Sequence, residues 1–238
     1  MARRYKHGFN PIDLTPLPQF GAIVRPHFVF DERLEGTGYE ETWSDGETVG
    51  GSSSLDEDAT PHASAPASWG SQSLQASTAA GETAYVGNTG LPDHNKFYFR
   101  AEIIYDTQGI SNGEIVYPVF FLHNATDNML LLAIFNSSGT LVFIVIDSRD
   151  GSFSQRENTG AISVDTLYRF EYKWDLSDNT VEWRINGSTI GSGSITGGGT
   201  SLNINDFFVG IVSNTSTGSD VVQLDRVAVS RHGWIGAA

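Results

Sequence analysis

Residues 168–186 carry the clearest alternation of apolar and polar positions in the chain. Aromatic residues occupy every second position from Tyr168 to Trp174, and apolar residues do so again from Val181 to Ile185. Alternate side chains of a strand point to the same face, so each run has one apolar face. The turn-forming stretch 175–179 joins the runs, and Asn186-Gly187 follows as a tight-turn dipeptide. The pattern predicts an aromatic β-hairpin that packs against a second sheet.

Similar strand-like runs recur along most of the chain, and no helical period longer than a turn or two interrupts them. The predicted strands cover 73–76, 82–87, 97–105, 115–123, 129–135, 141–146, 152–155, 167–174, 180–185, 188–191, 207–213 and 221–230. Many short strands joined by short turns are typical of sandwiches and jelly rolls. We therefore predict an all-β fold, a two-sheet antiparallel jelly-roll sandwich.

The sandwich is expected to span 27–238, with an acidic, Ser/Pro/Ala-rich loop at about 44–68. Residues 1–26 are predicted to form an extended arm, because four prolines favour extended backbone there. The arm is both basic and apolar, which favours contact with a neighbouring protein over an inert tail. Its candidate anchoring residues are Arg3, Arg4, Lys6, Phe9, Ile12, Leu14, Leu17 and Phe20.

Composition narrows the functional classes. The 238 residues include no cysteine, which excludes disulfides and cysteine-based metal sites. The formal net charge is −14, and the basic arm makes the remainder more acidic still, so we expect no nucleic acid partner. No signal peptide or membrane-spanning run is recognised, and no membrane partner is expected.

Four segments in order resemble a known group of sandwiches: 34–43, 70–74, the hairpin at 168–186 and the closing run 223–230. Together they resemble concanavalin A-like lectin/glucanase domains of the laminin-G-like type, over about residues 28–231. The resemblance implies a jelly roll whose first and last strands pair. The group includes glycoside hydrolases, sugar-binding modules and non-catalytic domains, so the fold alone does not set the function.

The spacing of carboxylate residues is informative about glycoside hydrolysis. A retaining glycosidase needs two carboxyl groups about 5 Å apart, and the glucanase relatives supply them from one strand as Glu-x-Asp-x-x-Glu. No candidate strand carries that spacing, and Glu171 and Glu182 stand alone among aromatic residues. The six histidines show no metal-ligand spacing. The sequence therefore predicts that the chain is not an enzyme, with a divergent glycoside hydrolase as the least favoured alternative.

Two kinds of binding site remain open. Aromatic residues in loop-like sequence could stack on sugar rings, and the candidates are Tyr39, Trp43, Trp69 and Trp234. The resemblance also implies a structural calcium ion where the first and last strands meet, for which Asp31 or Glu35 with Asp225 would supply oxygen ligands. No other cofactor is expected.

The arm decides between the functional hypotheses at this stage. An ordered, basic and apolar arm serves an assembly component better than a free-standing module. The sequence therefore favours a non-catalytic decoration, fibre or tail-associated protein on a virion surface, such as that of a bacteriophage. Its partners would be other proteins of the assembly and glycans, and homo-oligomerisation stays open. The alternative is an extracellular carbohydrate-binding module that is not part of a virion.

Overall fold

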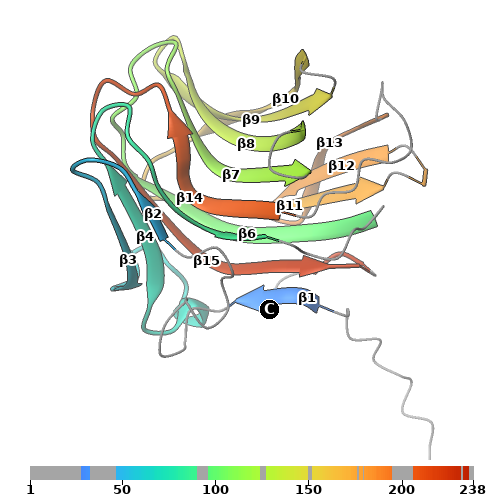
Figure 1. Ribbon diagram of the computed structural model, residues 1–238, viewed down its shortest axis with the longest axis horizontal. Helices are drawn as coiled ribbons and strands as arrows, with labels where there is room; N and C mark the ends of the chain where they lie inside the picture. The colour runs from blue at the N-terminus through green and yellow to red at the C-terminus, as the bar shows by residue number, and fades with distance from the viewer. Residues whose placement is uncertain are drawn as a thin grey trace, which may run out of the picture.

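The computed structural model describes residues 28–32, 47–89, 96–123, 127–149, 152–175, 177–178, 180–194, 206–231 and 233–235. These residues form two antiparallel β-sheets, and they contain a single turn of 3-10 helix, Ala67–Trp69, and no α-helix. In Figure 1, strands β10 to β7 and β14 succeed one another above β11, β6, β15 and β1. The predicted all-β jelly-roll sandwich is confirmed.

The first sheet has eight strands and contains the aromatic hairpin. Its order is β13-β12-β11-β6-β15-β4-β3, with β1 also paired to β15. The first described strand and the last strand therefore pair, as the resemblance implied. The bounds are β1 Phe28–Glu32, β3 Ser54–Ala59, β4 Ser73–Thr78, β6 Lys96–Thr107, β11 Leu167–Asp175, β12 Thr180–Ile185, β13 Ser188–Ser194 and β15 Asp220–Ser230.

The second sheet has seven strands in the order β10-β9-β8-β7-β14-β5-β2. Long strands β7, β8 and β9 curve along their length (Figure 1). The bounds are β2 Glu47–Val49, β5 Ala84–Asn88, β7 Ile115–His123, β8 Asp127–Ser137, β9 Thr140–Arg149, β10 Ser152–Ile162 and β14 Asp206–Asn214.

The core lies between the inner faces of the two sheets, and the aromatic hairpin supplies much of it. Phe170, Tyr172 and Trp174 of β11 and Trp183 of β12 are almost fully buried there. From the seven-stranded sheet, Phe121 packs edge-on against Phe99 of β6, with ring centroids 4.8 Å apart. Burial of this aromatic surface is the main force that holds the sheets together.

Tight turns set the registers of two hairpins, and one of these turns, Asn186-Gly187, was predicted from the sequence. Asn186 and Gly187 both adopt positive φ, 52° and 81°, and join β12 to β13. Ser138 and Gly139 do the same between β8 and β9, with φ of 53° and 86°. Two consecutive residues with positive φ match the twist of the flanking strands, which is why such dipeptides favour hairpins.

The segment 44–68 differs from its prediction as a loop, because it holds strands β2 and β3. Both lie at the free edges of their sheets, and β3 carries three consecutive acidic residues, Asp56, Glu57 and Asp58, after Leu55. Charged residues are typical of edge strands, which must avoid pairing with other chains. The same charges gave the segment its loop-like appearance. The described residues contain no helix of the length and apolarity that crossing a membrane requires.

Candidate functional site

The outward face of the eight-stranded sheet is charged. Cross-strand neighbours of opposite sign face one another on β6 and β11: Glu171 is opposite Arg100, and Arg169 is opposite Glu102. Arg169 and Glu171 also form an ion pair along β11, 3.5 Å apart. Arg100, Glu102 and Glu171 are nevertheless buried. This face is therefore covered, and its charges are satisfied within the protein.

One end of this face is a compact ion cluster around Asp175. Lys96 Nζ lies 2.7 Å and Lys173 Nζ 3.6 Å from Asp175 Oδ2, and Ser177 Oγ donates to Oδ1. Burial by itself would raise the pKa of Asp175, but the hydrogen bonds from Lys96, Ser177 and the backbone of Asp178 outweigh it and hold that pKa well below its ordinary value. The hydrogen bond to Asp175 likewise raises the pKa of Lys96. The cluster stabilises the hairpin end.

The segment 60–72 closes over the middle of the same face. Trp69 is fully buried, and its Nε1 donates to Glu102 Oε2 at 2.6 Å. Arg226, which adopts a positive φ of 54° in a bulge of β15, donates from Nε to the Ser68 carbonyl at 3.0 Å. The indole of Trp69 is part of the packing, so it does not offer a ring face for sugar stacking.

Trp234 follows β15 and lies over the same face beside Tyr98 of β6 and Arg184 of β12. Its ring packs edge-on against Tyr98, with centroids 5.4 Å apart, and the Arg184 guanidinium lies 3.7 Å above it. One ring face therefore already stacks on a cation, at which distance the attraction is strong. The other two sugar-stacking candidates, Tyr39 and Trp43, lie outside the described residues, and so does the whole of the arm 1–26 with its anchoring residues.

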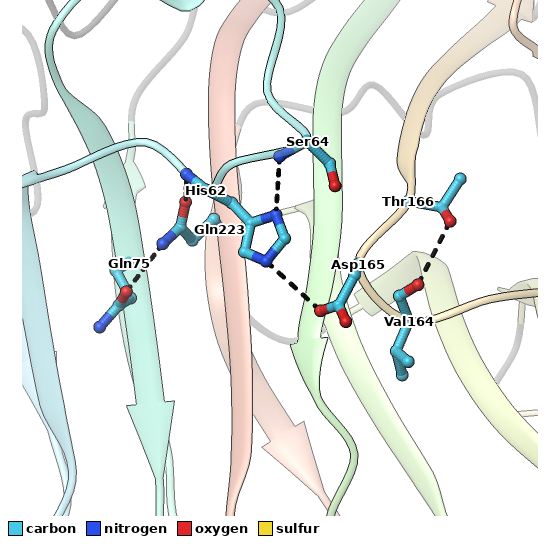
Figure 2. A network of polar contacts seen from close by, with 7 residues as sticks. All are labelled: His62, Ser64, Gln75, Val164, Asp165, Thr166 and Gln223. Atoms are coloured by element: carbon cyan, nitrogen blue, oxygen red, sulfur yellow. Dashed lines mark hydrogen bonds and ion pairs between the residues drawn. The ribbon is translucent and has the colours of Figure 1, made fainter.

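A polar network connects the segment 60–72 to both sheet and turn (Figure 2). The backbone N–H of His62 donates to Gln223 Oε1 at 2.7 Å, and Gln223 Nε2 donates to Gln75 Oε1 at 2.8 Å. The His62 imidazole lies between Ser64, whose N–H donates to Nδ1 at 3.1 Å, and Asp165, 3.4 Å from Nε2. Asp165 sits in the turn between β10 and β11, with a positive φ of 57°.

By distance alone, His62 and Asp165 of this network could hold a metal ion together with Asp106 of β6. Oxygen or nitrogen atoms of His62, Asp106 and Asp165 all lie within 4.8 Å of one another. A metal bound at Nε2 requires the imidazole proton on Nδ1, because a neutral ring has one lone pair on nitrogen. Nδ1 already accepts from the Ser64 N–H, so the proton belongs on Nε2, the nitrogen that faces Asp165 Oδ1 at 3.4 Å. The network therefore works as a structural link rather than as a metal site.

The calcium prediction falls at the pairing of β1 with β15. Asp31 lies opposite Ala228 in this ladder, three positions along β15 from Asp225. Asp225 is fully buried, and its Oδ1 accepts from the Arg226 N–H at 2.5 Å. Glu35 lies outside the described residues. The first and last strands meet as the prediction required, but a calcium ion at this place stays a prediction.

The outward face of the seven-stranded sheet has the opposite character. Because strand side chains alternate between faces, the residues between the core positions of β5, β7, β8, β9 and β14 point away from the sandwich. Apart from Ser137 and Thr140 near the turn between β8 and β9, most of the described side chains at these positions are apolar or aromatic, and we call the following ten the aromatic face: Tyr85, Ile115, Tyr117, Leu131, Ala133, Phe135, Val142, Ile144, Ile146 and Phe208. Five of the ten, Leu131, Ala133, Val142, Ile144 and Phe208, are buried.

Several aromatic rings on this face are only partly buried. Tyr85, Tyr117 and Phe135 retain exposed surface on three different strands. Tyr85 packs edge-on against Phe208, with ring centroids 5.6 Å apart. Phe208 in turn lies against Gly87, where an added Cβ would be 2.3 Å from its Cδ1. Rings supported in this way on rigid strands suit stacking on a flat, weakly polar ligand.

Sequence reasoning missed the aromatic face, because it sought sugar-stacking residues in loops. A signal was present: Met129–Phe135 and Leu141–Ile146 are apolar at nearly every position, not only at alternate ones. A strand whose two phases are both apolar has apolar side chains on both faces of its sheet.

No family model and no curated protein matches the chain. Solved structures do match its fold. Cellulose induced protein Cip1 is 17% identical, with a TM-score of 0.61 over 88% of this chain and 100% of that one. An endo-β-1,4-glucuronan lyase from the fungus Trichoderma reesei is 13% identical, with a TM-score of 0.58 over 85% and 94%. Alginate lyase vAL-1 from Chlorella virus is 12% identical, with a TM-score of 0.55 over 80% and 93%. These similarities confirm the two-sheet antiparallel jelly-roll sandwich.

The comparisons overturn two predictions. A virion decoration, fibre or tail role is not supported, since the matching sandwiches include polysaccharide lyases and a cellulose-induced protein. The prediction that the chain is not an enzyme is also wrong as argued. It rested on the missing carboxylate pair of a hydrolase, whereas a lyase cleaves by elimination and needs a base and an acid instead. The alternative of a carbohydrate-directed protein outside a virion is better supported.

Proposed function

We propose that this chain recognises a carbohydrate polymer, and that the aromatic face of the seven-stranded sheet holds it. The observation that carries the proposal is the set of partly exposed rings, Tyr85, Tyr117 and Phe135, on adjacent parts of one rigid sheet. Sugar rings present flat C–H surfaces that pack on aromatic side chains, and burial of both surfaces supplies the driving force.

Among the described residues, the outward face of the eight-stranded sheet is less suited to bind a polymer, which favours the aromatic face. Its outward face is covered by the segment around Trp69 and by Trp234, and its charges pair with one another. A polymer could reach it only by displacing those contacts. The names of the matching structures, which refer to glucuronan, alginate and cellulose, agree with a carbohydrate ligand without identifying it.

A polysaccharide panel tests the proposal directly. We expect the full-length protein to be retarded in native gels that contain at least one soluble polysaccharide, compared with a gel without it. The same mixtures, followed by ultraviolet absorbance, report any unsaturated product and so distinguish binding from lyase cleavage. Retardation by no member of a panel that includes β-glucans, mannans, galactans and polyuronates would contradict the proposal.

A further inference from the structure

The two outward faces differ most in where their positive charges lie. The lysine and arginine side chains that the structure describes belong to strands of the eight-stranded sheet or follow its last strand: Lys96, Arg100, Arg169, Lys173, Arg184, Arg226 and Arg231. Arg149, at the end of β9, and Arg156, in β10, belong to the seven-stranded sheet, and their side chains lie outside the described ones. The described side chains of the aromatic face include none. Any ligand on that face must therefore do without a cation from these residues.

Six of these seven cations already make contacts within the protein. Lys96 and Lys173 flank Asp175, Arg169 pairs with Glu171, and Arg184 pairs with Glu182 at 2.8 Å. Arg226 donates to the Ser68 carbonyl, and Arg100 Nε donates to the Arg226 carbonyl at 3.2 Å. Recruiting one of them to a ligand would break an existing contact and leave a charge unpaired, which is costly in buried surroundings.

Carboxylates lie at the borders of the aromatic face. Glu47 is on β2 beside β5, and Glu114 immediately precedes Ile115 of β7. Hydrogen bonding from the backbone of Ser111 is the main cause that lowers the pKa of Glu114, so this group stays ionised at neutral pH. The protein as a whole carries a formal net charge of −14. An anionic polymer would approach against this field.

From these charges we infer that the aromatic face takes a neutral polysaccharide and discriminates against polyuronates. This inference rests on the proposed function and specifies its ligand. A polyuronate carries one carboxylate on every sugar, and each would lose hydration against the described side chains of the aromatic face, none of which is a cation that could replace that hydration. A neutral polymer buries only hydroxyl and C–H groups, and many of its hydroxyls can remain in water while one sugar face stacks on the rings.

Native affinity gels with two sets of polymers test this inference. The neutral set is hydroxyethylcellulose, galactomannan and laminarin, and the anionic set is alginate, polygalacturonate and glucuronan, each at low and at moderate salt. We expect retardation by at least one neutral polymer, with an affinity that changes less than about twofold between the salt concentrations. We expect affinities for the anionic set at least about tenfold weaker.

Variants assign the binding to the aromatic face. Tyr117→Ala and Phe135→Ala should each weaken retention by the neutral polymer about tenfold. Trp234→Ala is the matched control, because it removes an aromatic ring from the opposite sheet and should leave retention unchanged. Thermal unfolding of each variant checks that the protein remains folded, and Tyr117→Phe serves as the conservative variant if Tyr117→Ala does not fold.

The outcomes separate the inference from the proposed function. Equal or stronger retention by a polyuronate overturns the neutral-polymer inference and leaves carbohydrate recognition standing. Neutral retention that survives both aromatic-face substitutions, or is lost in Trp234→Ala, overturns the assignment to this face. If no polymer is retained and sedimentation shows that Tyr117→Ala converts a dimer into a monomer, the face is an interface between two copies, and both proposals fail.

Discussion

The two outward faces of this sandwich differ in the polarity of their side chains and in how far the chain covers them. The outward face of the eight-stranded sheet carries charged side chains, and other segments of the same chain cover them. Trp69, Arg226 and Trp234 are therefore part of the packing. The seven-stranded sheet turns apolar side chains outward and leaves some of its rings partly exposed. Partly exposed apolar surface that folding has not buried is available for a ligand. The comparison therefore favours the apolar face of the seven-stranded sheet as the ligand site over the charged face of the eight-stranded sheet.

The largest expected effect is on the covered face. Trp69→Ala should lower the free energy of unfolding by about 3–5 kcal/mol, because it empties a fully buried site and leaves Glu102 without its indole donor. Urea denaturation measures this loss. Trp69→Phe keeps most of the volume and separates the packing contribution from that of the hydrogen bond. Wild-type stability in Trp69→Ala would show that the segment 60–72 does not cover the sheet.

A substitution at Gly87 tests the support of the aromatic face. Gly87→Ala should cost about 1–3 kcal/mol of stability and also weaken carbohydrate retention, because the new Cβ would lie 2.3 Å from Phe208 Cδ1 and displace the ring. Gly193→Ala is the matched control, since its Cβ meets Val181 Cγ2 at an ordinary 3.7 Å. Chemical denaturation and affinity gels report the two effects. Equal behaviour of the two variants would contradict the packing described for Phe208.

The ion cluster at Asp175, on the outward face of the eight-stranded sheet, predicts that the free energy of unfolding depends on pH through this carboxylate. The folded-state pKa of Asp175 lies below its unfolded value of about 3.9, so ionisation stabilises the fold above that value. This stabilisation is lost as the pH falls from about 4 through the folded-state pKa. Asp175→Asn should cost about 1–3 kcal/mol at pH 7 and flatten the decline below pH 4. An unchanged acid profile in the variant would assign the decline to other carboxylates.

The smallest effect is expected at His62 and Asp165. Their side chains are 19% and 55% exposed, and such pairs contribute about 0–1 kcal/mol. Asp165→Asn should therefore shift the melting temperature only slightly, and added Zn²⁺ should not raise it in the wild type. A zinc-dependent rise in the wild type that Asp165→Asn abolishes would show that the network binds metal after all, with a rotated His62 or Ser64.

Much of the fold could be predicted because its signals are local. The alternation in 168–174 and 181–185, together with Asn186-Gly187, specifies a hairpin, and its two strands form as expected. The strands in 44–68 were not predicted, because edge strands carry charged residues and serines, as loops do. Local pattern identifies a strand more easily than the sheet to which it belongs.

The sites were harder to predict because they depend on long-range placement. Trp69 lies in loop-like sequence, yet the partner that buries it is Glu102, 33 residues away. His62 meets Gln223 across 161 residues. The aromatic face combines residues of β5, β7, β8, β9 and β14, and no short motif joins them. Only the runs in β8 and β9 that are apolar in both phases of the strand indicated that a second apolar face exists.

The central claim is that the ligand lies on the aromatic face, and methyl NMR tests it most directly. Isoleucine-labelled protein would be titrated with a polysaccharide that retards it in gels. Ile115, Ile144 and Ile146 report on the aromatic face, whereas Ile104 is on the outward side of the eight-stranded sheet. We predict shifts at the first three methyl groups and none at Ile104. Shifts at Ile104 with unchanged Ile115, Ile144 and Ile146 would place the ligand on the charged face and contradict the account.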